Sequence, residues 1–124
     1  MTLSTSAKGS MSLAELRTAL RQFASDREWE QFHSPKNLAI ALSVEASELL
    51  EHFQWTADTA SAALTDDRRT KIRAEVADVL LYLIILADKL DIDLLAAATE
   101  KIQVNALKYP VEKARGSSKK YTEL

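Results

Sequence analysis

Two short acidic motifs, Glu45-x-x-Glu48 and Glu75-x-x-Asp78, contain the side chains best suited to chemistry in this sequence. Each motif places two carboxylates three residues apart, within an apolar stretch of helical period. Residues three apart are neighbours on one face of a helix, so each motif directs two negative charges the same way. Both apolar faces should turn inward, and burying an unpaired charge is costly. The four carboxylates therefore need a positively charged partner.

A divalent cation is the partner that the chemistry favours. Hard oxygen ligands suit Mg²⁺, which shares its positions between carboxylates, waters and phosphate oxygens. Such an ion can polarise and orient a phosphoryl group, and we expect Mn²⁺ to substitute for it. We therefore expect Glu45, Glu48, Glu75 and Asp78 to bind the metal and form the catalytic site for a phosphate substrate. One carboxylate would accept a proton from attacking water, and the sequence leaves open which one.

The composition excludes several other classes of protein. The chain has 124 residues, enough for one domain, with 16 Lys and Arg against 18 Asp and Glu. This balance predicts no nucleic-acid partner and no membrane partner. There is no cysteine, hence no disulfide, thiolate nucleophile or cysteine zinc site. The longest apolar run, 79–87, is too short to cross a bilayer, and the first ten residues do not resemble a signal peptide. We expect a cytoplasmic protein.

The scarcity of turn residues predicts an all-α fold, since only two Gly and two Pro occur in the chain. We expect a subunit resembling a four-helix bundle, with helices at about 13–29, 34–54, 66–90 and 93–108. The start signals are a Ser12/Glu15 capping box, the Ser34-Pro35 pair, and Asp91 or Asp93 as a cap.

Three further regions complete the expected organisation. Residues 1–11 should form a disordered leader, 12–110 the helical domain, and 111–124 an irregular basic tail. Residues 56–65 should form a loop or a short helical excursion. The third helix is apolar on almost every side, which is typical of a helix enclosed on all sides. Because one small bundle would leave part of it exposed, we expect a homo-oligomer, either a dimer or a dimer of dimers.

The two motifs, EASEL at 45–49 and EVADVL at 75–80, resemble the E-x-x-E…E-x-x-D pattern of the all-α nucleoside triphosphate pyrophosphohydrolases, the MazG-like superfamily. Four flanking segments narrow the resemblance to the dCTP pyrophosphatase branch. These segments are REWEQFH (27–33), FQW (53–55), KIQVNALKYP (101–110) and ARGSSKKYTEL (114–124). The resemblance covers about residues 13–124.

The resemblance implies hydrolysis of dCTP, or a 5-modified dCTP, to dCMP and pyrophosphate by a magnesium-dependent homotetramer that sanitises the nucleotide pool. It gives the metal-binding role to the four carboxylates, and it implies that Trp29 and Trp55 contact the base or wall its pocket. Contacts to sugar, base or phosphates are implied for His33, Tyr82, Lys101, Asn105 and Tyr109. Leu20 stands where some animal members carry a histidine, which implies looser or shifted base selectivity.

Two other classes of protein fit parts of the pattern. A carboxylate-bridged di-iron bundle would need Glu-x-x-His on two helices, and neither motif ends in histidine. A non-catalytic helical interaction module would use the acids as salt-bridge partners at an interface. Lys71 and Lys89 lie toward the acidic sector of the third helix, but too far along it to neutralise four acids. The sequence favours the enzyme, with the interaction module as the alternative.

Overall fold

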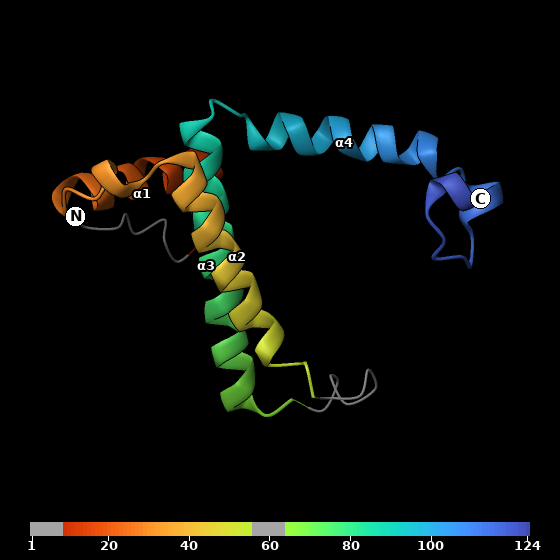
Figure 1. Ribbon diagram of the computed structural model, residues 1–124, viewed down its shortest axis with the longest axis horizontal. Coiled ribbons are helices and arrows are strands. Elements are labelled where there is room, and N and C mark those ends of the chain that lie inside the picture. Colours follow the sequence, from red (N-terminus) through yellow and green to blue (C-terminus); the bar gives the residue numbers. More distant parts are fainter. Residues whose placement is uncertain (1–8, 56–63) are drawn as a thin grey trace. The chain divides into compact units, whose positions relative to one another are not determined.

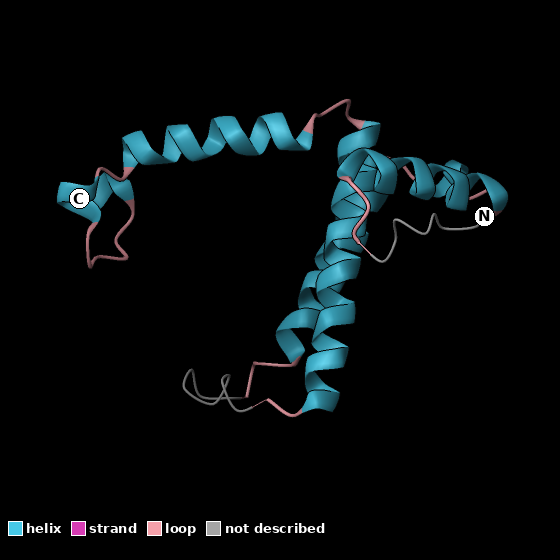
Figure 2. Ribbon diagram, turned by 180° about the vertical axis from the view of Figure 1, so that it is seen from behind, coloured by secondary structure: helices cyan, strands magenta, loops and turns pink. Residues whose placement is uncertain are grey.

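The computed structural model describes residues 9–55 and 64–124, and all regular elements within these ranges are helical (Figures 1 and 2). The elements are α1 (Leu13–Asp26), η2 (Glu30–Phe32), α2 (Pro35–Glu51), α3 (Asp66–Lys89), α4 (Leu94–Lys108), α5 (Val111–Ala114) and η4 (Tyr121–Glu123). The predicted all-α class is confirmed. The expected leader at 1–11 and the expected loop at 56–65 fall largely outside the described residues. No described helix is long and apolar enough to span a membrane.

The helix starts follow the signals in the sequence. Ser12 and Glu15 form the complete capping box at the start of α1. The Ser34 side chain accepts the hydrogen bond that caps α2, and Pro35 is the first helical residue. Asp93, one of the two expected residues, caps α4. These caps satisfy N–H groups that have no partner within their helices.

The end of α1 differs from the expectation. The helix ends at Asp26, three residues before the expected end at Trp29. Glu28 adopts a φ of 55°, and the Trp29 N–H donates to the Ala24 carbonyl at 2.9 Å. This left-handed closure terminates the helix and sends the chain in a new direction. As a result the Trp29 ring meets Phe23 edge-on, with the ring centres 5.7 Å apart.

The chain divides into two compact units, one up to Asp91 and the other from Ile92 to Leu124. In the first unit α2 and α3 lie side by side, and α1 packs against the end of α3 (Figure 1). The buried hydrophobic residues of the described chain come from all three helices: Ala24, Leu38, Ile84 and Ala87. Leu38 is 1% exposed, and burying a leucine contributes about 2 kcal/mol. This small core fixes the three helices that carry the candidate site.

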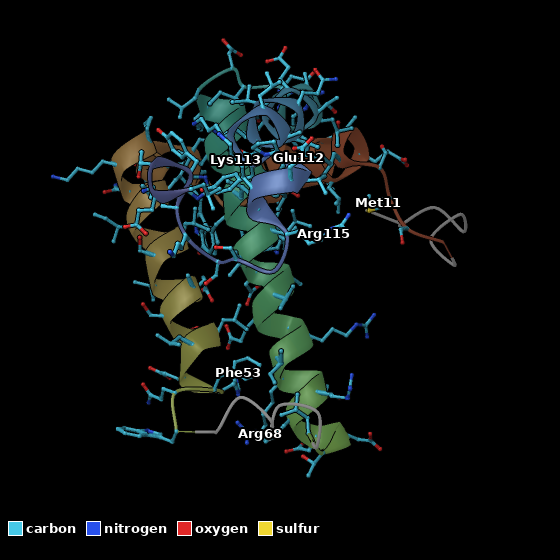
Figure 3. The ribbon with its side chains drawn as sticks, turned by 90° about the vertical axis from the view of Figure 1, so that its right-hand side faces the viewer. Met11, Phe53, Arg68, Glu112, Lys113 and Arg115 are labelled. Atoms are coloured by element: carbon cyan, nitrogen blue, oxygen red, sulfur yellow. The ribbon has the colours of Figure 1, made fainter. Side chains whose placement is uncertain are left out.

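Arg68 links the C-terminal end of α2 to the N-terminal end of α3. Its side chain donates a hydrogen bond to the carbonyl of His52, the residue that ends α2. Figure 3 shows Arg68 and Phe53 at this end of the helix pair. The bond satisfies a helix-terminal carbonyl and sets the separation of the two helices there. Glu48 lies one turn before this junction and Glu75 two turns after it.

The second unit contains α4, α5 and η4. The expected irregular tail instead contains the short helix α5 and the turn η4. Tyr121 of η4 packs edge-on against Tyr109, with the ring centres 6.0 Å apart, and the Lys108 Nζ lies 4.8 Å from the centre of the Tyr121 ring. The tail thus folds back on the last turn of α4 through aromatic and cation–π contacts.

Candidate active site

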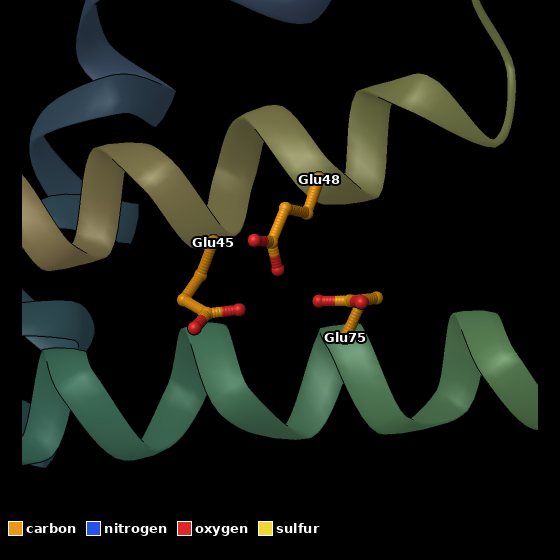
Figure 4. A group of neighbouring side chains, drawn as sticks. All are labelled: Glu45, Glu48 and Glu75. Atoms are coloured by element: carbon orange, nitrogen blue, oxygen red, sulfur yellow. The ribbon is translucent and has the colours of Figure 1, made fainter.

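Three carboxylates from the two acidic motifs converge between α2 and α3. Glu45 and Glu48 point from α2 toward Glu75 on α3 (Figure 4). Each offers a carboxylate oxygen, and these oxygens all lie within 4.8 Å of one another. The convergence follows from helix geometry, because residues 45 and 48 lie on one face and the two helices run side by side. We call these three residues the carboxylate cluster.

The surroundings of the carboxylate cluster disfavour its negative charges. All three side chains are half-buried. Burial, which is the largest cause, the adjacent Glu48 carboxylate and the charge of Asp78 together raise the pKa of Glu45 to about 7. The Oε2 atoms of Glu45 and Glu75 are buried without a hydrogen-bond partner. Buried polar atoms normally find partners, so these two oxygens are suited to coordinate a ligand.

A divalent cation fits this arrangement. The ion pairs within the described ranges are Arg21 with Asp88 and Lys71 with Asp67, and neither pair involves the cluster. Carboxylate oxygens are the ligands that Mg²⁺ prefers, and two ligands on opposite sides of Mg²⁺ lie about 4.2 Å apart. The spacing of the cluster oxygens is therefore compatible with one shared cation. Such a cation would compensate the repulsion that raises the pKa of Glu45.

Asp78, the fourth predicted ligand, stands apart from the cluster. It lies one turn after Glu75 and is exposed. Its oxygens are not among those that lie mutually within 4.8 Å, although its charge affects the pKa of Glu45. Asp78 also lines a cavity beside α1. It therefore stands between the carboxylate cluster and this cavity, and its role as a metal ligand stays a prediction.

The cavity is walled by α1, α3 and the segment between α1 and α2, and its volume is about 250 Å³. Its lining residues are Leu20, Phe23, Ala24, Trp29, His33, Asp78, Leu81, Tyr82 and Ile85. Three of them, Trp29, His33 and Tyr82, are predicted substrate-binding residues. The volume is near the lower end of the roughly 300–1,000 Å³ typical of small-molecule sites. Aromatic and aliphatic walls suit a flat heterocycle, and we call this space the aromatic cavity.

His33 contributes a buried ring nitrogen beside the aromatic cavity. Its Nδ1 atom is buried without a hydrogen bond. A buried nitrogen in this state can form a hydrogen bond with a ligand that enters the cavity. Leu20 lines the same wall, so an aliphatic side chain takes the place for which the resemblance implied a histidine in some relatives.

The remaining predicted substrate-binding residues lie elsewhere. Trp55 is 89% exposed at the end of the first described range. Lys101 and Asn105 lie on α4, and Tyr109 is its C-terminal cap residue. These three residues belong to the second unit, whereas the carboxylate cluster belongs to the first. Their contacts with a substrate stay predictions.

Sequence reasoning did not identify several features of the site. Phe23, Leu81 and Ile85 were expected only as apolar helix positions, yet they line the aromatic cavity. Their helical spacing was the only feature of the sequence that could have indicated a place on an inward-facing side of a helix. The ion pair between Arg21 and Asp88 joins residues 67 positions apart. No local pattern connects residues at such a separation.

Comparison with known proteins assigns a family. The MazG-like family matches residues 40–124 of this chain. The chain is 43% identical to dCTP pyrophosphatase 1 of Mus musculus and 42% identical to that of Homo sapiens. Each match spans 114 residues, 90% of this chain and 67% of the relative. The chain belongs to the MazG-like family, which confirms the resemblance found in its acidic motifs.

A solved structure supports the same assignment. The crystal structure of a pyrophosphatase from Archaeoglobus fulgidus matches with a TM-score of 0.76 and 39% sequence identity. The match covers 82% of this chain and 94% of that one. Together, the family and these relatives support a nucleotide pyrophosphohydrolase, the enzyme class that the sequence predicted.

Proposed function

We propose that this protein is a magnesium-dependent nucleotide pyrophosphohydrolase. Its substrate is dCTP or a 5-modified dCTP, its products are dCMP and pyrophosphate, and its role is sanitation of the nucleotide pool. The observation that carries the proposal is the position of Asp78, which lines the aromatic cavity and whose charge reaches the carboxylate cluster. A base in the cavity and phosphates at the cluster would thus belong to one molecule. The names of the relatives favour dCTP as that molecule.

Glu45, Glu48 and Glu75 would hold the metal, since their carboxylates cluster and two of them have a buried oxygen without a hydrogen-bond partner. Mg²⁺ is the proposed ion and Mn²⁺ its substitute. When bound, it supplies neutralisation of the phosphate charges and polarisation of the phosphoryl oxygens. The carboxylates themselves fix its position, because they extend from two helices packed side by side.

The remaining side chains would position the nucleotide and transfer a proton. Trp29 and Tyr82 would hold the base by ring contacts, and His33 Nδ1 would form a hydrogen bond with its edge. Release of pyrophosphate requires that water attack the α- or the β-phosphorus, so that the bond to their bridging oxygen breaks. Asp78 is the carboxylate best placed to accept the proton of that water, since it lines the cavity and lies outside the cluster.

Purified protein should release pyrophosphate from dCTP only when Mg²⁺ or Mn²⁺ is present. The measurement is a panel of triphosphates, including dUTP, dTTP and 5-methyl-dCTP, assayed for pyrophosphate and monophosphate. Excess chelator should stop the reaction, and added Mg²⁺ should restore it. Full activity in chelator would contradict the metal requirement, and absence of pyrophosphate from every triphosphate would contradict the proposed reaction.

We also propose that the protein works as a homo-oligomer, a dimer or a tetramer. Large apolar side chains of α2 and α3 are 37–53% exposed, namely Ile40, Val44, Val76, Leu80 and Leu83. Monomeric proteins rarely leave extended apolar surfaces in water. A second copy would bury these side chains and enclose α3, whose apolar residues cover nearly every side.

Light scattering should give a mass of two or four times 13.8 kDa, the mass of one chain. Leu80→Arg should lower this mass, because it places a charge on the exposed apolar face of α3. Arg73→Lys, at an exposed charged position on the same helix, is the matched control. A monomer mass for the unaltered protein would refute the assembly.

A further inference from the structure

Arg21 and Asp88 form a two-point link between α1 and α3. The Arg21 Nε donates to Asp88 Oδ2 at 2.8 Å, and its Nη2 donates to Oδ1 at 2.5 Å. The Asp88 side chain is 20% exposed, and the hydrogen bonds from Arg21 hold its pKa below the usual value. A paired guanidinium–carboxylate contact fixes orientation as well as distance. We call this pair the Arg21–Asp88 link.

The link adjoins the wall of the aromatic cavity. Arg21 and Asp88 both line a second, smaller cavity of about 40 Å³. The two cavities share four lining residues, Leu20, Ala24, His33 and Ile85. Leu20 directly precedes Arg21 on α1, and Ile85 lies one turn before Asp88 on α3. The charged pair therefore lies beside residues that also line the aromatic cavity.

We propose that Arg21 and Asp88 are positioning residues, which set the width of the aromatic cavity by fixing α1 against α3. This inference rests on the proposed function, which identifies the ligand of the cavity as a nucleotide. The two helices also bury apolar side chains, Ala24 of α1 and Ala87 of α3. Apolar contacts of this kind are not directional, so they allow small shifts that a paired polar contact opposes.

The position of the link predicts a specific kinetic effect. The link controls one wall of the cavity, which α1 contributes through Leu20 and Phe23. It does not touch the carboxylate cluster, which lies between α2 and α3. Breaking the link should therefore weaken nucleotide binding and leave the chemical step nearly unchanged, because preorganisation of the binding wall is lost.

The test compares Arg21→Ala, Asp88→Asn and the exchanged pair Arg21→Asp with Asp88→Arg. Each is assayed for KM and kcat with dCTP and Mg²⁺, and for Kd with a nonhydrolysable dCTP analogue by calorimetry. The single variants should raise KM and Kd about three- to tenfold, a usual size for lost coupling between contacting residues. They should keep kcat within about twofold, and the exchanged pair should recover most of the binding. Gln22→Ala is the control, since Gln22 bonds to Asp26 within α1.

Three results would overturn the inference. One is unchanged KM and Kd in both single variants, and another is an equal fall in kcat. The third is an exchanged pair that binds no better than the single variants. Should Arg21→Ala fail to fold, Arg21→Lys replaces it, because it keeps the charge and cannot form both bonds. Failure of the unaltered protein to bind nucleotide would overturn the proposed function as well, whereas normal binding in all variants would overturn the link alone.

Discussion

Glu48→Gln should lower pyrophosphate release from dCTP by at least about 100-fold. The substitution replaces one carboxylate of the carboxylate cluster with a neutral amide and scarcely changes the shape of the side chain. Because Glu48 faces both Glu45 and Glu75, its loss removes one of three converging ligands. The measurement is the steady-state rate with Mg²⁺, together with Mn²⁺ affinity from electron paramagnetic resonance.

Glu51→Gln is the matched control for this experiment. Glu51 lies on the same helix, three residues later, and is exposed. It should keep activity within about twofold, since surface substitutions away from a site have small effects. Circular dichroism melting of both variants would show that the fold is retained. More than half of the normal rate in Glu48→Gln, with normal Mn²⁺ affinity, would refute a role for the cluster in metal binding.

In the absence of metal, the folded protein should lose stability as the pH rises from about 4.5 to about 7. Glu45 keeps its proton in the folded chain up to a pKa of about 7, whereas its ordinary pKa is 4.5. Between these values the folded state binds the extra proton, so the free energy of unfolding falls as the pH rises. The contribution is complete below pH 4.5 and lost above pH 7. Solvent screening keeps this contribution below roughly 3.4 kcal/mol.

Thermal melting in chelator, across this pH range, measures the effect. Glu45→Gln should flatten the Tm profile relative to the unaltered protein, because the variant has no proton to lose at that position. Added Mg²⁺ should raise Tm most above pH 7, where the Glu45 carboxylate is ionised and binds a cation best. Identical profiles for the variant and the unaltered protein would contradict the raised pKa.

Local signals in the sequence predicted most of the fold. Ser34-Pro35 and Asp93 marked helix starts correctly, because a cap depends on residues within one turn of it. The convergence of Glu45 and Glu48 was predictable for the same reason, since three-residue spacing fixes a common face. The MazG-like family was also recognisable from these short motifs and their flanking segments.

Features that depend on backbone exceptions or distant contacts were not predictable. Glu28 adopts a positive φ that glycine usually takes, so nothing in its residue type marked the end of α1. Arg21 and Asp88 meet only because α1 packs on α3. Asp78 shares a three-residue spacing with Glu75, yet that spacing did not reveal that it faces the aromatic cavity. Spacing gives the face of a helix, and packing decides what that face meets.

The hydrogen bond from Arg68 to the His52 carbonyl has a consequence for tolerance to insertions. Because it joins the ends of α2 and α3 directly, and the two helices also pack side by side, their register is held by contacts outside the chain between them. The entropy of closing a connection rises only slowly with its length, by about 0.6 kcal/mol for each doubling. Homologues could therefore gain or lose residues between positions 55 and 64 while their acidic motifs stay in register.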